Sequence, residues 1–341
     1  MNVVERVDPI ALGLDGLRAL MVEWGEPAYR AEQLYRYALR ATPVERMNTL
    51  PAALRLRLAE TLTNSSVVIE RELTSNDGEC VKYLYRLSDG ECIEGVRMRY
   101  HHGDTLCLST QVGCRMGCSF CASTLDGLAR NLSAGEMLGQ VAAAAERSPI
   151  HNIVLMGSGE PLDNYDNTVL FLRALRDPKG FDIGMRRMSL STCGLADAVE
   201  RFAGENLPVT LCVSLHAPDD ATRRTLVPVA ARYPIDRLLA ACRMYLRETG
   251  RRVIFEYALL DGVNDSPGHA GRLAERIRGM QCHVNLIPLN PIPERDWRPS
   301  SESTVITFQN ALENLGISVT RRRTLGDSVQ GACGQLRRSV M

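Results

Sequence analysis

Three cysteines lie close together in the stretch "CRMGCSFC", at positions 114–121. Cys114, Cys118 and Cys121 are separated by three and then by two residues, and cysteines this closely spaced are typical ligands of a metal centre. Three thiolates are one ligand short of a closed tetrahedral site. An open position of this kind distinguishes catalytic metal sites from structural ones.

Four interpretations of the motif compete. Buried structural thiols would not explain why three cysteines crowd into one glycine-bearing loop. Zinc would need a fourth ligand, usually from a second paired motif, and the chain has no second Cys-x-x-Cys. A thioredoxin-like pair would use Cys118 and Cys121 and leave Cys114 idle. We favour an iron–sulfur cluster with three thiolate ligands and one open iron, because it uses all three cysteines.

The composition is that of an ordinary globular protein. The chain has 341 residues, of which 45% are hydrophobic and 23% charged. It contains no apolar run long enough to span a bilayer, and its N-terminus lacks the layout of a signal peptide. Eleven cysteines, an odd number scattered along the chain, do not resemble a secreted disulfide framework. We therefore expect a cytoplasmic protein with no membrane partner.

The charge gives no direct sign of a nucleic-acid partner, because the formal net charge is zero. Two of the 40 basic residues, Lys82 and Lys179, are lysines and the other 38 are arginines. Guanidinium groups suit phosphate recognition, but a GC-rich genome also produces this ratio. The arginine clusters at 321–323 and 337–338 are therefore only a weak hint of an anionic partner.

Apolar strand segments and helical segments alternate from about residue 104 onward. The strands are expected at 105–110, 151–156, 186–191, 209–215, 253–259 and 282–288, and the helices near 133–147, 164–176, 195–204, 235–249 and 267–279. A helix near 302–315 and a strand near 317–323 follow, and Ser133 with Glu136 forms a capping box. Six βα repeats with right-handed crossovers predict an α/β fold, a partial (β/α)6 barrel.

Two smaller units precede this pattern. Helical periodicity over residues 12–62 predicts three helices, the last beginning at Pro51. Alternating segments at 81–87 and 92–100, joined by an Asp-Gly turn, predict a β-hairpin. We therefore expect a helical N-terminal domain at 1–65, a hairpin extension at 66–103 and a core at 104–341.

Polar residues gather where the predicted core strands end, which is where α/β folds bind their ligands. These residues are Glu160, Ser191, Ser214, His216 and Asn290. On the second hairpin strand, Glu94 lies on a largely apolar face. It is either an edge-strand acid that reaches solvent or a pocket carboxylate whose raised pKa lets it handle protons near neutrality.

The cysteine loop resembles the signature of radical S-adenosylmethionine (SAM) enzymes, including the aromatic Phe120 before the last cysteine. "GSGEP" at 157–161 is similar to the Gly-Glu-Pro stretch of the same enzymes. The resemblance implies a [4Fe–4S] cluster on the three cysteines, with SAM bound to the open iron and reduced to a 5′-deoxyadenosyl radical. It also implies that Gly159 and Glu160 hold the SAM ammonium group.

A narrower resemblance covers almost the whole chain. The motifs "TLCLSTQVGCRMGCSFCAS", "MGSGEPL", "VSLHAP", "GVND", "NLIPLNP" and "GACGQL" are similar, in order, to the RlmN/Cfr family of RNA adenosine methyltransferases. The likeness runs from about Glu94 to Leu336. "GEPAYRAEQLY" in the N-terminal helices also resembles the accessory, RNA-binding domain of that family.

This family resemblance implies roles for further residues. Cys333 accepts a methyl group from a first SAM, a second SAM supplies the radical, and Cys107 is the thiol that releases the product by forming a disulfide. Glu94 is then the proton acceptor, which favours the second of its two interpretations. The positions that match SAM contacts are Ser191, Ser214, Leu215, His216 and Asn290.

The resemblance implies that the substrate is an adenosine of 23S rRNA, and also one of tRNA. It further implies that flavodoxin or ferredoxin is the electron donor and that the enzyme is a monomer.

RlmN-type enzymes methylate carbon 2, and Cfr-type enzymes methylate carbon 8 and confer antibiotic resistance. "GEPL" and "NLIPLNP" are closer to the first type, whereas "RYPID" and "RMRY" resemble the second; Cys193 in "STCG" departs from the family pattern. We favour carbon 2. The alternatives from other classes are a non-catalytic zinc- and RNA-binding protein and a radical SAM enzyme with a small-molecule substrate.

Overall fold

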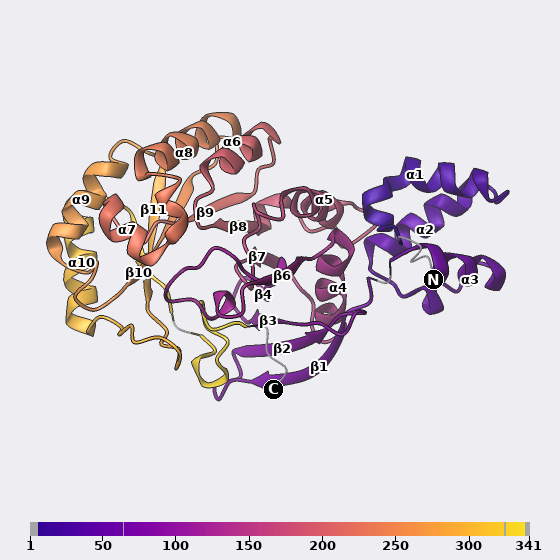
Figure 1. Ribbon diagram of the computed structural model, residues 1–341, viewed down its shortest axis with the longest axis horizontal. Coiled ribbons are helices and arrows are strands. Elements are labelled where there is room, and N and C mark those ends of the chain that lie inside the picture. The colour runs from indigo at the N-terminus through magenta and orange to yellow at the C-terminus, as the bar shows by residue number, and fades with distance from the viewer. Residues whose placement is uncertain (1–5, 64, 324, 338–341) are drawn as a thin grey trace.

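A ten-stranded sheet organises the chain in the computed structural model, which describes residues 6–63, 65–323 and 325–337 (Figure 1). The strands follow one another in the order β1-β2-β3-β4-β7-β8-β9-β10-β11-β12. Their bounds are β1 Val68–Thr74, β2 Cys80–Arg86, β3 Cys92–Met98, β4 Thr105–Cys107, β7 Asn152–Leu155, β8 Met188–Thr192, β9 Thr210–Ser214, β10 Val253–Leu259, β11 Cys282–Pro288 and β12 Val319–Arg321.

The parallel part of the sheet runs from β4 to β12. A helix follows each of its first six strands and returns the chain to the next strand. These helices are α4 Ala134–Ala145, α5 Tyr165–Arg176, α6 Ala196–Gly204, α8 Ile235–Thr249, α9 Pro267–Ile277 and α10 Glu302–Asn314. The predicted partial (β/α)6 barrel is confirmed, and so is the capping box that opens α4.

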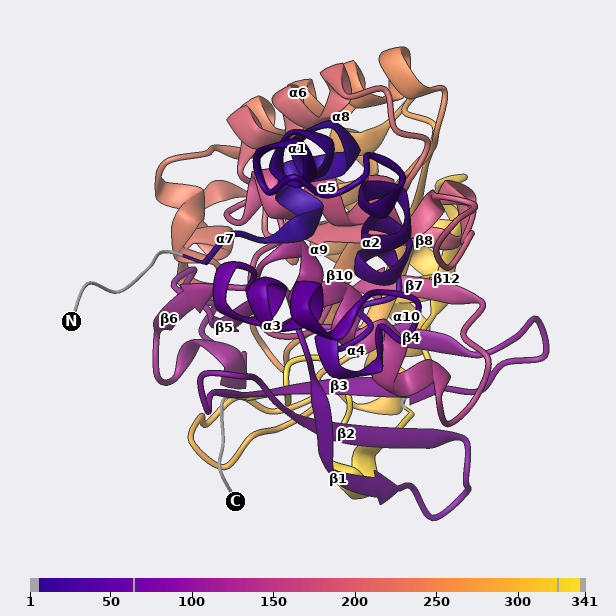
Figure 2. The same ribbon diagram turned by 90° about the vertical axis from the view of Figure 1, so that its right-hand side faces the viewer.

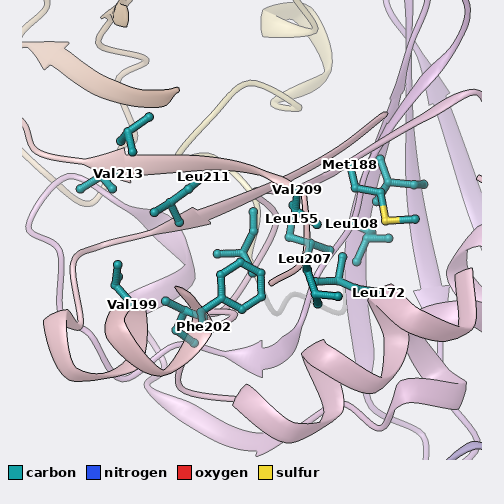
Figure 3. Packing of buried hydrophobic residues seen from close by; sticks show 14 of the residues in the cluster. Leu108, Leu155, Leu172, Met188, Val199, Phe202, Leu207, Val209, Leu211 and Val213 are labelled. Carbon is teal, nitrogen blue, oxygen red and sulfur yellow. The ribbon is translucent and has the colours of Figure 1, made fainter. Parts of the chain in front are cut away.

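The main hydrophobic core lies between this sheet and its helices. Figure 3 shows one part of it, where Leu211 and Val213 of β9 face Val199 and Phe202 of α6. All four side chains are buried. Full burial of such side chains stabilises the fold by about 1.5–3 kcal/mol each, so the apolar strands that the sequence displays are also those that hold the barrel together.

An antiparallel extension continues the sheet beyond β4. The predicted hairpin is present as β2 and β3, and β3 pairs with β4 through Val96 and Cys107. The sequence did not predict β1, which pairs with the outer side of β2. Its run of charged residues, Glu70 to Glu72, is largely exposed, so the strand has no apolar face to reveal it.

A small sheet and a short helix were also not predicted. A two-stranded sheet of β5 Gln111–Gly113 and β6 Leu128–Asn131 flanks the cysteine loop. A short helix, α7 Asp220–Leu226, follows the end of β9. Both are too short for their periodicity to stand out.

Three helices pack together at the N-terminus, in front of the barrel in Figure 2. They are α1 Pro9–Glu23, α2 Tyr29–Leu39 and α3 Ala52–Thr61. Pro51 caps α3 rather than being its first helical residue. Leu17, Leu34 and Leu58 form the centre of a separate hydrophobic cluster. Across the described residues, no helix has both the length and the apolarity needed to cross a bilayer.

Candidate functional site

The cysteine loop connects β5 to β6, and it begins at a glycine that no other residue could replace unless neighbouring atoms moved. Gly113 has a φ of +76°, and a Cβ built on it would lie 1.9 Å from the carbonyl oxygen of Gly127. The same oxygen accepts a hydrogen bond of 2.9 Å from the backbone N–H of Cys114. The two ends of the loop are therefore joined to each other, and this contact fixes the position of the first cysteine.

One side chain within the loop and one from a distant segment donate hydrogen bonds to its backbone carbonyls. The Thr124 hydroxyl donates to the carbonyls of Cys118 and Cys121, at 3.2 and 2.9 Å. The Trp297 indole N–H donates to the carbonyl of Ser119 at 3.0 Å. These bonds fix the backbone that carries the three cysteines.

All three cysteines line one cavity with the ends of the parallel strands. The cavity measures about 940 Å³, a volume that includes space open to solvent. Of the predicted site residues, it is lined by Cys114, Cys118, Cys121, Gly159, Glu160, Ser191, Ser214, His216, Asn290 and Cys333. Leu215 does not line it, since its side chain is buried in the main core. The structure thus brings together nearly all residues that the sequence placed at the strand ends.

Glu160 links two neighbouring strand ends. Its carboxylate accepts hydrogen bonds from the backbone N–H groups of Leu162 at 3.0 Å and Cys193 at 2.7 Å. Burial raises the pKa of this carboxyl, although the two hydrogen bonds oppose the shift. Glu160 also lines the cavity, where a ligand ammonium group could pair with its carboxylate.

His216 is a buried residue held in a left-handed conformation, with a φ of +57°. Its Nδ1 accepts a hydrogen bond of 2.9 Å from the backbone N–H of Ala258, which leaves Nε2 as the protonated nitrogen. Burial, and secondarily the Arg223 guanidinium, lowers the pKa of His216 to about 3. The ring therefore acts as a neutral donor near neutral pH.

Cys333 lies at the junction of two cavities. It lines the cavity described above and also a smaller neighbouring one, where Cys107 forms part of the wall. Burial raises the pKa of the Cys107 thiol to about 12, and the nearby Cys333 adds to the shift. All eleven cysteines are free thiols in this structure.

Glu94 is not an edge-strand acid that reaches solvent. Strand β3 lies between β2 and β4, and Glu94 is 1% exposed. Its Oε1 lies 2.7 Å from the Lys82 Nζ, and its Oε2 accepts a hydrogen bond of 2.9 Å from the backbone N–H of Arg337. The other interpretation placed Glu94 in a pocket, but the side chain is absent from the linings of the two cavities. Its carboxylate instead contacts the segment that carries Cys333.

Sequence reasoning missed several charged residues around the site. Arg322 lines both cavities, and the negative charge of a Cys333 thiolate beside it raises the pKa of the Arg322 guanidinium. Glu256 of β10 is buried beside the first cavity, and the Asn285 amide donates to its carboxylate at 2.9 Å. A single acid inside the apolar strand "VIFEYAL" was a signal that could have identified Glu256.

A third missed residue, Arg223, is fully buried and holds two strand ends together. Its guanidinium donates to the carbonyl of Cys193 at 2.6 Å and to that of Leu215 at 3.2 Å. In the sequence it is one of 38 arginines, so nothing marked it as special.

The donor set fits an iron–sulfur cluster better than a single metal ion. Within the described residues, no group of three or more His, Cys, Asp or Glu side chains is placed to hold one ion. A [4Fe–4S] cluster does not need that convergence, because its cysteines bind different irons. Burial raises the pKa of all three thiols, that of Cys114 to about 12, so their thiolate forms need a positively charged partner. Cluster iron supplies such a partner.

Comparison with known proteins agrees with this chemistry. The model of the Radical SAM superfamily matches residues 108–273. A protein of Alkaliphilus oremlandii named "Probable dual-specificity RNA methyltransferase RlmN" is 46% identical over 338 residues, covering 98% of each chain. A protein of the same name from Pelotomaculum thermopropionicum is 48% identical, with 99% of this chain and 93% of the relative covered.

A solved structure shows the same architecture. The crystal structure of a radical SAM methyltransferase from Sphaerobacter thermophilus matches with a TM-score of 0.92 at 46% identity. The match covers 98% of this chain and 100% of that one. The similarity therefore extends beyond the barrel to the hairpin extension and the N-terminal helices.

Proposed function

This chain belongs to the RlmN family of radical SAM RNA methyltransferases, and from that premise we propose that it methylates carbon 2 of an adenosine in 23S rRNA and of one in tRNA. The proposal of two RNA substrates is supported by the "dual-specificity" in the names of the relatives. The proposal of carbon 2 rests on the RlmN-like motifs "GEPL" and "NLIPLNP".

The observation that carries the proposal is the position of Cys333 between the two cavities. A methyl group on its sulfur can face the cluster cysteines on one side and Cys107 on the other. When bound, the cluster and SAM supply a methyl group and a radical able to remove hydrogen from an S-methyl group. Two SAM molecules are then used per turnover, one for each purpose.

The remaining steps fall to side chains of this chain. After loss of one hydrogen atom from the S-methyl group, the methylene carbon on Cys333 adds to the adenine carbon. The adduct then returns one electron to the electron carrier that serves the enzyme, which leaves a closed-shell thioether. The Cys107 thiolate attacks the Cys333 sulfur, so that the bond from sulfur to methylene breaks and a disulfide forms. Glu94 accepts the proton that leaves the adenine carbon, and the released methylene carbon takes up a proton to become the methyl group. An external reductant returns both cysteines to thiols.

Other side chains bind and orient SAM. Glu160 would receive the SAM ammonium group, while Ser191, Ser214, His216 and Asn290 would contact the rest of the molecule. The neutral His216 ring suits a hydrogen bond from Nε2 to a hydroxyl or carboxylate oxygen. We further propose that a flavodoxin or ferredoxin donates the electrons and that the enzyme acts as a monomer.

The test is the reaction itself, run anaerobically with purified protein, SAM, a reductant and either rRNA or tRNA. Mass spectrometry of the digested RNA is expected to show 2-methyladenosine. A product consisting only of 8-methyladenosine would contradict carbon-2 specificity. Formation of 2-methyladenosine in rRNA but not in tRNA would remove tRNA from the proposal.

The Cys107→Ala variant tests the covalent route. Without the resolving thiol, the RNA is expected to stay attached to Cys333 as a stable adduct that survives denaturation. Cys282→Ala is the matched control, because Cys282 lines neither cavity and its loss should leave product release intact. Absence of an adduct in the Cys107 variant would count against the S-methylcysteine route.

A further inference from the structure

A buried ion pair lies beneath the C-terminal segment that carries Cys333. The Lys82 Nζ and the Glu94 Oε1 are 2.7 Å apart, and their side chains are only 3% and 2% exposed. Lys82 pairs with Val96 across the hairpin, so Lys82 and Glu94 are diagonal neighbours on one face of β2 and β3. Removing two charges from water is costly, and a buried ion pair is often no more stabilising than an apolar pair of similar volume. Its retention calls for a reason other than stability.

Each member of the pair also bonds to the C-terminal segment. The Lys82 ammonium donates to the carbonyl of Gln330 at 3.2 Å. The Glu94 Oε2 accepts from the backbone N–H of Arg337 at 2.9 Å. In sequence these two contacts lie on either side of Cys333. Both views show this segment, in yellow, beside the hairpin (Figure 1 and Figure 2).

We propose that Lys82 is a positioning residue, whose ion pair with Glu94 clasps residues 330–337 from both ends and so holds Cys333 between the two cavities. The importance of this position rests on the proposed function, in which Cys333 carries the methyl group. The clasp assigns Glu94 a structural task in addition to its proposed role as proton acceptor.

The segment needs such a clasp because little regular structure holds it. After a single 3₁₀ turn at Asp327–Val329 it forms no helix or strand up to residue 337. Gln330, where Lys82 binds, has a φ of +49°, a conformation that a non-glycine residue rarely adopts unless its surroundings impose it. The ammonium group on its carbonyl is one such constraint.

Other contacts hold the segment on the side of the cluster cavity. The backbone N–H of Ala122 donates to the carbonyl of Gly334 at 2.7 Å, and the Ser123 hydroxyl donates to that of Leu336 at 2.7 Å. The Asn290 amide donates to the carbonyl of Cys333 itself at 3.1 Å. These bonds fix one side of the segment, and the clasp fixes the opposite side, against the hairpin.

The first experiment uses the two lysines of the chain. Amine acetylation of the anaerobically purified holoprotein, followed by peptide mass spectrometry, compares the buried Lys82 with the exposed Lys179 in one sample. Lys82 is expected to react slower by a factor of about 100 or more, because its ammonium group is both buried and paired. Comparable rates would mean that the clasp is not formed in solution and would overturn the proposal.

The second experiment measures how firmly Cys333 is held. Iodoacetamide alkylation of Cys333, without RNA, is compared for the native protein, Lys82→Met, Lys82→Arg and the matched control Lys179→Met. Lys82→Met is expected to react about tenfold faster or more, because the remaining carboxylate is left buried without its partner. Lys82→Arg keeps the positive charge and is expected to stay within about threefold of the native rate.

A double variant separates the clasp from general loss of stability. The double variant, Lys82→Met with Glu94→Leu, has no unpaired buried carboxylate, so the melting temperature of the protein is expected to stay near the native value. Because neither new side chain can bond to the segment, Cys333 should still react about tenfold faster than in the native protein. Native alkylation rates in this folded double variant, or in Lys82→Met, would overturn the proposal.

These readouts do not depend on RNA methylation. A native protein that protects both Lys82 and Cys333 but makes no methyladenosine would contradict the proposed function and leave the clasp standing. Methyladenosine formed at the native rate by a double variant with a freely reactive Cys333 is not expected, since Glu94 is also assigned to proton transfer. Its observation would exclude Glu94 as the proton acceptor and would leave the clasp standing, because removal of the ion pair would still have freed Cys333.

Discussion

Replacing Gly113 by alanine should disturb the cysteine loop where its two ends meet. Two separate penalties apply at this position. The left-handed backbone, with a φ of +76°, costs an alanine about 1–2 kcal/mol. The added Cβ would also lie 1.9 Å from the backbone oxygen of Gly127, and backbone cannot rotate away as a flexible side chain could. Forced overpacking of this kind typically costs a further ~1–3 kcal/mol.

Gly127→Ala provides a control within the same loop. Gly127 has a similar left-handed conformation, with a φ of +66°, but a Cβ built on it meets no atom within 4 Å. This control therefore suffers only the backbone penalty. We expect about 1–2 kcal/mol of destabilisation for Gly127→Ala and about 2–5 kcal/mol for Gly113→Ala. At roughly 2 °C per kcal/mol, the melting temperatures should fall by about 2–4 °C and 4–10 °C.

The two variants should also differ in cluster retention. Relieving the clash moves the Gly127 oxygen away, and this oxygen accepts the hydrogen bond from the backbone of Cys114. Gly113→Ala is therefore expected to lose iron and the visible absorption of the cluster faster than Gly127→Ala. Equal melting shifts and equal iron contents in the two variants would refute the argument, because the carbonyl contact would then have no consequence.

Two further predictions concern the strand ends. The Glu160→Gln side chain offers one oxygen to two buried backbone N–H groups, so one of these donors is left unpaired. We expect the free energy of unfolding in urea to fall by about 2–4 kcal/mol and SAM to bind more weakly by calorimetry, and an unchanged stability would contradict the assignment. His216→Asn keeps an acceptor for the N–H of Ala258. Because the pKa of folded His216 is lowered to about 3 from 6.5, its stabilising contribution is complete above pH 6.5 and lost as the pH falls, by roughly 3 kcal/mol at pH 4. The variant should therefore show a shallower acid dependence of unfolding in the apoprotein, and parallel curves would contradict the reasoning.

The barrel was predictable because its elements are strongly periodic. The strand "VIFEYAL" was expected over 253–259 and is found as Val253–Leu259. The helix after it was expected near 267–279 and is found as Pro267–Ile277, opened by the cap of Ser266. Such segments bury a continuous apolar face, so local composition and the final packing agree.

Elements without an apolar face were missed. Strand β1 is charged and mostly exposed, and it exists because the outer side of β2 offers unpaired backbone groups. The solvent-exposed interpretation of Glu94 failed for a related reason. Whether a strand is internal depends on its neighbours, and β3 became internal by pairing with both β2 and β4.

The sequence by itself determined the chemistry available to this protein. The three cysteines proposed as cluster ligands lie within eight residues, and the strand-end motifs come together because the carboxyl ends of parallel strands meet at one edge of the sheet. Only the tertiary structure decided how Cys333 meets that chemistry. Its place depends on a hairpin register that sets Lys82 beside Glu94 and on contacts from residues more than 200 positions away, which no local pattern encodes.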